Sequence, residues 1–343
     1  MSNYYIADKN EIKNIYSRLK SDALRNRVLR KEEVYEKIPR IAKIDEEISL
    51  LNIDFIKSRL RNMAKDRSKD SDIERKKKLA LLNKEKTTLL KESGYPSDYL
   101  LVHYSCPICK DEGFVNGKRC ECFNKRLADI LYKQSSHADI IKKESFENFS
   151  LSYYSHELIA GYKKSPYDNM VDKLEKAKEF TKQFDNRGQN ILIYGEAGLG
   201  KSFLSHAISK ELIESGHSVL YVSANELFSD ILSKYLMSYD TDTKLKVEPV
   251  YELVYNADLL VIDDLGTEVP NNFTASQVFE VVNQRLIQNR STIITTNLSV
   301  QDLSKAYSER LMSRFVDRYE FFNIFGKDIR YQKKQQAFQN KNK

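Results

Sequence analysis

A glycine-rich segment in the middle of the chain has the composition of a phosphate-binding loop. It reads Gly195-Glu196-Ala197-Gly198-Leu199-Gly200-Lys201-Ser202, and it directly follows the apolar run 190–194. In the order strand, loop, helix, the backbone N–H groups of the loop and of the helix start face the phosphates of a nucleotide. Lys201 then supplies a positive charge to the terminal phosphates, and the Ser202 hydroxyl reaches Mg²⁺. The segment predicts a site for ATP and Mg²⁺.

Two further predicted strands end in polar residues. The run 259–262 leads into Asp263 and Asp264, and the run 292–296 leads into Asn297. Behind a phosphate-binding loop, Asp263 is expected to bind Mg²⁺, directly or through water, while Asp264 polarises the attacking water. Asn297 is placed to position that water against the γ-phosphate. Taken alone these residues are ordinary turn residues, and their order in the chain favours the catalytic interpretation.

The four cysteines form a second group of residues that could bind a ligand. All four fall in two close pairs, Cys106 with Cys109 and Cys120 with Cys122. Tetrahedral Zn²⁺ takes four thiolates at ~2.3 Å, and two tight pairs let a short chain wrap the ion. A closed shell of four thiolates leaves no position for water, so the predicted zinc site is structural. Four unligated thiols are the alternative, and His103 is either a replacement ligand or a surface residue.

The elements before these sites are predicted to be helical. Residues 11–90 are densely charged, and apolar side chains recur at helical spacing at Ile44, Ile48, Leu51 and Phe55. The polar stretch 66–72 separates this helix from a second one bearing Leu79, Leu82 and Leu89. The pattern predicts an antiparallel helical hairpin, whose charges are either a solvated surface or a docking surface.

The predicted fold class is α/β, with a parallel sheet flanked by helices, preceded by the helical hairpin and the small zinc module. We expect a helical region at 1–100, the zinc module at 101–135, a linker at 136–165 and the nucleotide-binding domain at 166–343. The linker holds four aromatic residues, too many for a featureless connection, so part of it is expected to pack on the core: Phe146, Phe149, Tyr153 and Tyr154.

The composition of the chain bears on its partners and on its location in the cell. Lys and Arg outnumber Asp and Glu by 56 to 49, which gives a net charge of +7 and is compatible with a nucleic-acid partner. No apolar run approaches the ~18 to 20 residues of a membrane span. The first residues have neither signal-peptide nor transit-peptide character. We therefore expect a soluble, cytoplasmic protein.

Together, the nucleotide motifs resemble the core of AAA+ ATPases. More narrowly, residues 146–330 resemble the bacterial replicative DNA helicase loaders of the DnaC and DnaI type, which are related to the initiator DnaA and the transposition helper IstB. The motifs that carry this resemblance are 195–202, 261–266, 295–297, 308–315 and 326–330.

The resemblance implies roles for residues that spacing alone does not assign. It makes Asn297 the sensor 1 residue and Arg314 an arginine finger that reaches the ATP of a neighbouring subunit, with Arg310 on the same helix face. It places Arg330 at sensor 2, against the γ-phosphate in cis. Surface pairing of the two arginines with Glu309 or Asp317 is the alternative. The pair Asp263-Asp264 stands where most AAA+ enzymes have Asp-Glu, which implies slow hydrolysis, and the short basic segment after Arg330 is expected to be disordered.

The resemblance also implies a function. It predicts an ATP-dependent loader that binds the hexameric replicative helicase through its N-terminal region and delivers it to single-stranded DNA. Residues 225–246 match the family's DNA-binding insertion, with Lys234, Lys244 and Lys246 available to phosphates, although a packed helix with incidental lysines is an equal alternative. The competing functions are an IstB-like regulator of DNA transposition and a zinc-containing DNA-binding adaptor with a nucleotide switch.

Overall fold

The computed structural model describes residues 9–61, 69–135, 137–185, 188–268 and 271–341. The chain divides into two compact units: one comprises Lys13–Val115, and the other consists mainly of Asn116–Lys343. Within the described ranges, no helix combines the length and the apolar character needed to cross a membrane.

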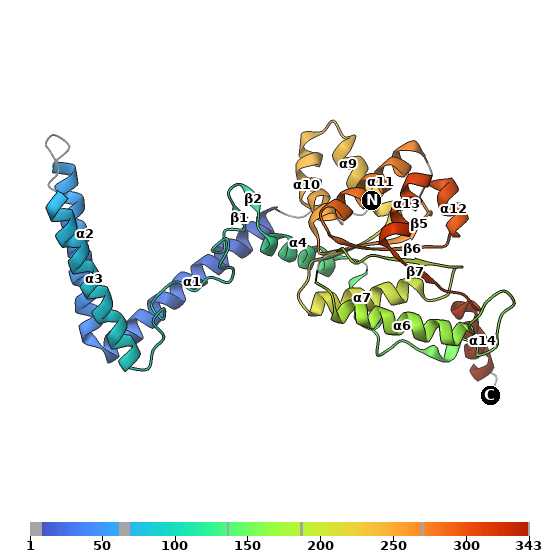
Figure 1. Cartoon of the computed structure of the whole chain (residues 1–343), viewed down its shortest axis with the longest axis horizontal. Coiled ribbons are helices and arrows are strands. Elements are labelled where there is room, and N and C mark those ends of the chain that lie inside the picture. The colour runs from blue at the N-terminus through green and yellow to red at the C-terminus, as the bar shows by residue number, and fades with distance from the viewer. Residues whose placement is uncertain (1–8, 62–68, 136, 186–187, 269–270, 342–343) are drawn as a thin grey trace. The chain divides into compact units, whose positions relative to one another are not determined.

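The first unit contains most of α1 (Lys9–Lys37), together with α2 (Pro39–Arg61) and α3 (Lys69–Glu92). Arg40 bonds to Glu85 and Arg75 bonds to Asn52, so α2 and α3 run antiparallel (Figure 1). These two helices are the predicted hairpin. The separate helix α1 was not predicted: it ends just before Pro39, which lacks an N–H group and suits the first turn of a new helix. Of the predicted polar break, residues 66–68 lie outside the described residues, and the remainder begins α3.

The second unit is built on a five-stranded parallel sheet, as the sequence predicted. Its strands, in the order β4-β5-β6-β3-β7, are β4 (Val219–Ser223), β5 (Leu259–Leu265), β6 (Ser291–Thr296), β3 (Ile191–Tyr194) and β7 (Glu320–Asn323). Neighbouring pairs are all parallel. The carboxyl ends of β3, β5 and β6 therefore meet at one edge, where ligands bind in open parallel sheets.

Helices cover both faces of this sheet (Figure 1). The helices α6 (Pro166–Lys182) and α7 (Lys201–Glu214) lie on one face, and α10 (Thr241–Asn256), α11 (Asn272–Ile287) and α13 (Glu309–Arg318) lie on the other. A further helix, α12 (Val300–Ala306), follows β6. The sheet residues are apolar on both sides because both sides are covered.

The insertion after β4 is helical, as predicted. It consists of α8 (Ala224–Glu226), the wider turn η2 (Leu227–Leu232) and α9 (Ser233–Leu236), followed by α10. The predicted apolar face is buried: Leu227, Phe228, Ile231 and Leu232. Lys234 pairs with Asp230 at 2.6 Å.

Three short elements before α6 also pack on the ATPase core: α4 (Glu121–Gln134), α5 (Ala138–Lys143) and η1 (Leu151–Tyr153). The helix α4 contacts β4, and α5 contacts α7. Phe146 and Tyr154 are buried in the core cluster, with Phe149 and Tyr153 against it. Part of the segment 136–165 therefore packs on the core, and α4 packs there as well.

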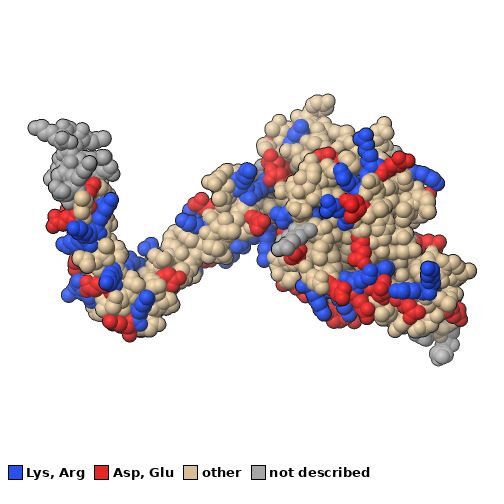
Figure 2. All heavy atoms as spheres, in the orientation of Figure 1, with Lys and Arg blue, Asp and Glu red and all other residues tan. Residues whose placement is uncertain are grey.

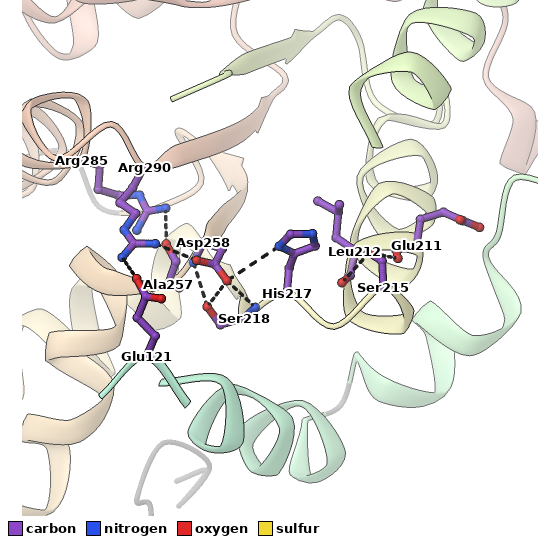
Figure 3. Close-up of polar contacts among 10 residues, drawn as sticks. All are labelled: Glu121, Glu211, Leu212, Ser215, His217, Ser218, Ala257, Asp258, Arg285 and Arg290. Carbon is purple, nitrogen blue, oxygen red and sulfur yellow. Dashed lines mark hydrogen bonds and ion pairs between the residues drawn. The ribbon is translucent and has the colours of Figure 1, made fainter. Parts of the chain in front are cut away.

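A network of polar contacts lies at the N-terminal ends of strands β4, β5 and β6, opposite the nucleotide site (Figure 3). The Asp258 carboxylate accepts hydrogen bonds from the N–H and hydroxyl of Ser218 and from Arg290, whose guanidinium also lies 3.5 Å from Glu121 on α4. Fully buried Arg285 donates to the carbonyl oxygens of Val254, Ala257 and Ser291. Burial lowers the pKa of Arg285 to about 9. The network connects the residues just before β4 and β5 with the start of β6.

The end of the described chain is helical, contrary to the prediction of a disordered tail. The helix α14 spans Ile329–Lys341. Its first N–H groups are satisfied because the Asp328 carboxylate accepts from the backbone of Arg330 and Tyr331. An aspartate at this position stabilises a helix start.

Candidate active site

The predicted phosphate-binding loop connects β3 to α7, and its glycines are required by geometry. Gly200 precedes α7 with φ of +90°, in the left-handed region that side chains disfavour. A Cβ atom on Gly195 would lie 1.9 Å from the carbonyl oxygen of Ile324. The loop therefore passes β7 only with glycine at this position, and it presents the free N–H groups of the α7 start to a ligand.

Lys201 is held at the centre of the site. Its Nζ donates to the carbonyl oxygens of Gly195 (2.8 Å) and Glu196 (2.7 Å) and to Oδ1 of Asn297 (2.6 Å). Burial lowers the pKa of Lys201. The structure thus joins two residues that lie 96 positions apart in the sequence and that were both predicted to act on the terminal phosphate.

The two residues predicted to hold Mg²⁺ also meet. Ser202 Oγ donates to Oδ1 of Asp263 at 3.1 Å, and Thr295 Oγ1 donates to the same carboxylate oxygen at 2.6 Å. Thr295 also accepts from the backbone N–H of Asp264 at 2.8 Å. A hydroxyl and a carboxylate side by side are the oxygen ligands that Mg²⁺ prefers. Thr295 therefore contacts both aspartates. This role could not be predicted from the sequence, because a threonine in a strand is common.

Asp264 is set apart from Asp263 by an irregularity in β5. The pairing register shifts between Ile262 and Leu265, and Asp264 has φ of +54°. Such a bulge re-aims a side chain, and Asp264 lines the same cavity as Lys201 and Asn297. Burial and the neighbouring Asp263 carboxylate raise the pKa of Asp264. A raised pKa makes a carboxylate a stronger general base.

A cavity of about 490 Å³ extends from the phosphate-binding loop, within the size range of ligand pockets. It is lined by Ala197 to Ser202, by further residues of α7, by Asp264 and Asn297, by the segment 140–154 and by α14. Arg330 on α14 is among the lining residues, and its predicted contact with the γ-phosphate stays a prediction. Gly195 and Glu196 do not line it, and their carbonyl groups hold Lys201 instead.

Tyr154 supports the loop from the segment before the core. Its hydroxyl donates to the carbonyl oxygen of Leu199 at 2.8 Å, and burial raises its pKa. The aromatic content of this segment predicted packing, but nothing in its spacing indicated which tyrosine contacts the loop.

The two arginines of α13 lie elsewhere. Arg310 and Arg314 are both exposed and do not line the cavity. Their assignment to the ATP of a neighbouring subunit therefore stays a prediction.

The cysteines gather into one group. Their four sulfur atoms lie within 4.8 Å of one another, whereas the thiolates of a tetrahedral zinc site lie roughly 4 Å apart. Backbone groups shape the first pair: the N–H of Gly113 donates to the Cys109 sulfur at 3.3 Å, and Asp111 accepts from the N–H of Cys106 at 2.8 Å. The short strands β1 (Phe114–Val115) and β2 (Lys118–Arg119) lie between the pairs. The donor set and its geometry are compatible with Zn²⁺.

His103 does not belong to this group. Its ring contacts the carbonyl oxygen of Asp98 at 3.0 Å and the guanidinium of Arg30 at 3.3 Å. Among the described residues, the four cysteines form the only group of three or more His, Cys, Asp or Glu side chains close enough to hold a metal ion.

The parallel sheet, the phosphate-binding loop, the acidic strand end and the polar strand end define a P-loop ATPase of the AAA+ class. The chain belongs to the IstB-like ATP binding protein family, whose profile matches residues 166–337. The predicted ATPase activity and AAA+ class are thereby confirmed.

The chain is also similar in sequence to proteins of DNA replication. The chain is 27% identical over 220 residues to the replicative helicase loader DnaC of Escherichia coli (strain K12), covering 64% of this chain and 82% of DnaC. It is 28% identical over 191 residues to the chromosomal replication initiator protein DnaA of Treponema pallidum (strain Nichols), covering 54% of this chain and 36% of DnaA. A crystal structure of the DnaC helicase loader matches with a TM-score of 0.42 at 24% identity, covering 52% of this chain and 98% of that one.

Proposed function

We propose that this protein is an ATP-dependent loader that binds the replicative DNA helicase and delivers it to single-stranded DNA during replication initiation. The supporting observation is the extent of the similarity to DnaC. The similarity spans 220 residues, which is longer than the stretch from Pro166 to residue 343. It therefore includes sequence before the ATPase core. A likeness confined to the core would not separate a loader from other AAA+ proteins.

At the nucleotide site, we assign Lys201 and Arg330 to the terminal phosphates in cis. Ser202 and Asp263 would hold Mg²⁺, which neutralises phosphate charge when bound. Asp264 accepts the proton of the attacking water, and Asn297 orients that water. The lowered pKa of Lys201 and the raised pKa of Asp264 arise in the same half-buried cavity, as is typical of catalytic groups.

Completion of the site requires a second copy of the chain. We assign Arg314 as the arginine finger of the neighbouring subunit, with Arg310 beside it. Both are exposed, four residues apart on α13, and a planar guanidinium fork suits the oxygens of a γ-phosphate. ATP would thus promote self-association.

The remaining regions have separate proposed tasks. Residues 1–100 would bind the helicase, and the cysteines would hold a structural zinc ion. The insertion would contact single-stranded DNA through Lys244 and Lys246. On the face drawn in Figure 2, basic and acidic side chains are intermingled over the ATPase unit, so DNA binding would rest on a few lysines and not on a broad basic surface.

The test is light scattering of the full chain mixed with the replicative helicase of its host, with and without ATP and Mg²⁺. A discrete complex that is lost when residues 1–100 are removed supports the loader. If no complex forms under any nucleotide condition, the loader proposal fails.

One alternative has its own support. The matching family is that of IstB-like ATP binding proteins, so a regulator of DNA transposition is the second candidate. It predicts tight duplex DNA binding and recruitment of a transposase, with no helicase complex. A zinc-containing adaptor whose nucleotide site is vestigial would retain its function when Lys201 is replaced, whereas a loader would lose ATP-dependent release.

A further inference from the structure

The end of the nucleotide cavity away from Lys201 carries an unexplained polar group. Glu144, directly after α5, lines the cavity together with His206 of α7. His206 lies five residues after Lys201 on the same helix, about 7.5 Å further along its axis. Because the same cavity is lined by the loop start and by these two residues, a nucleotide with its phosphates at the loop has room to place its nucleoside here.

At this end of the cavity, one carboxylate oxygen of Glu144 is left to accept a hydrogen bond from a ligand. His206 Nδ1 donates to Oε2 of Glu144 at 2.6 Å, because a carboxylate only accepts. Among the described residues, Oε1 of Glu144 has no hydrogen-bond donor. Asn148 donates one of its two amide N–H groups to the carbonyl oxygen of Lys143 at 2.8 Å.

Apolar side chains complete this end of the cavity. Phe149 and Phe203 meet edge to face with ring centroids 5.2 Å apart, and Ile140 lies with them in the lining. Flat apolar walls with one fixed carboxylate suit an aromatic base or a sugar that carries hydrogen-bond donors. The Glu144 side chain is 30% exposed and tied to buried His206, so its orientation is set before a ligand binds.

We propose that Glu144 recognises the nucleoside half of ATP, its free carboxylate oxygen accepting a hydrogen bond from the 6-amino group of adenine or from a ribose hydroxyl. Adenine carries a donor where guanine carries an acceptor. The carboxylate therefore favours ATP over GTP if the base is the donor. This inference rests on the ATPase class and is independent of the loader function.

The first experiment uses the unaltered full chain, with binding of nucleotides in Mg²⁺ measured by calorimetry. If adenine is the donor, purine riboside triphosphate, which lacks the 6-amino group, binds about tenfold more weakly than ATP. If ribose is the donor, the 2′-deoxy or 3′-deoxy analogue shows that loss instead. Equal affinity for all four nucleotides overturns the proposal.

The second experiment replaces Glu144 by Gln and, as a control, exposed Glu147 by Gln, which lies outside the cavity lining. In Glu144→Gln, the amide oxygen accepts from His206 and a donor now faces the ligand. The variant should lose the preference for ATP over the discriminating analogue, and the control should keep it. An equal loss for every nucleotide, or identical behaviour of the two variants, shows a structural role only and overturns the proposal.

Discussion

The nucleotide site and the N-terminal helical unit are stabilised by different kinds of contacts. At the site, Lys201 and Thr295 are buried, and each contacts several groups that converge on one point. In the helical unit, Arg40 joins α2 to α3 through an ion pair with Glu85 that faces water, and Leu50 and Ile53 are 54% and 46% exposed. A site that surrounds one ligand fixes residue types and spacings, whereas a helix surface tolerates many sequences. Substitutions should therefore have larger effects at the first region than at the second.

The largest effect is expected at the site. Lys201→Ala removes the charge that faces the phosphates and should reduce ATP hydrolysis by about 10³-fold or more. Steady-state phosphate release checks this. The control Lys210→Ala lies on the same helix, with its amine 3.9 Å from Glu214, and should hydrolyse ATP like the unaltered protein. Hydrolysis that survives in Lys201→Ala would contradict the assigned site.

Removal of the metal ligands should come next. The double substitution Cys106→Ser, Cys109→Ser halves the donor set, and structural zinc sites depend on all four ligands. Elemental analysis should find about one zinc per chain in the unaltered protein and none in the variant. A zinc-free unaltered protein, purified without chelator, would favour unligated thiols.

A smaller effect is expected from Thr295→Val, which keeps the shape but removes the hydroxyl between the two aspartates. The loss of one charged hydrogen bond and of the acceptor for the Asp264 N–H should lower kcat by roughly 10-fold to 100-fold. The control Thr292→Val alters a buried hydroxyl on the same strand that binds Arg285 at 3.0 Å, far from the aspartates. If both variants lose kcat equally, Thr295 acts only on stability.

The smallest effect is expected in the helical unit. Burial raises the pKa of Asp45, but Lys86, Tyr35 and Lys31 outweigh it, and the folded pKa is lowered. Asp45→Asn should cost about 1 kcal/mol at neutral pH, since much of the ion pairing is screened by water.

The stability that Asp45 contributes should decrease as the pH falls. A lowered folded pKa adds stability above the unfolded value near ~3.9, and this contribution is lost as pH falls through the folded pKa. The melting difference between the unaltered protein and Asp45→Asn should therefore be nearly constant above about pH 5 and shrink as the pH falls below about 4. A difference that grows on acidification would show that Asp45 is not ionised and paired.

The same contrast determines what could be predicted from the sequence. The phosphate-binding loop, the acidic pair and Asn297 were located because their spacing follows from one ligand, and the structure brings Lys201 to Asn297. Thr295 and Tyr154 were missed as contacts because a strand threonine and a loop tyrosine have many structural uses. The helix break before Pro39 and the helix α14 were missed although each has a sequence signal, because proline cannot continue a helix and Asp328 can cap one. The charged helices predicted secondary structure but no specific contact.

The most direct test of the account is helicase delivery to tailed single-stranded DNA, measured as ATP-dependent strand unwinding by the host replicative helicase. We predict that the full chain increases unwinding, and that Lys201→Ala still binds the helicase but fails to deliver it. Unwinding that is unaffected by the full chain, or increased equally by Lys201→Ala, would contradict an ATP-dependent loader.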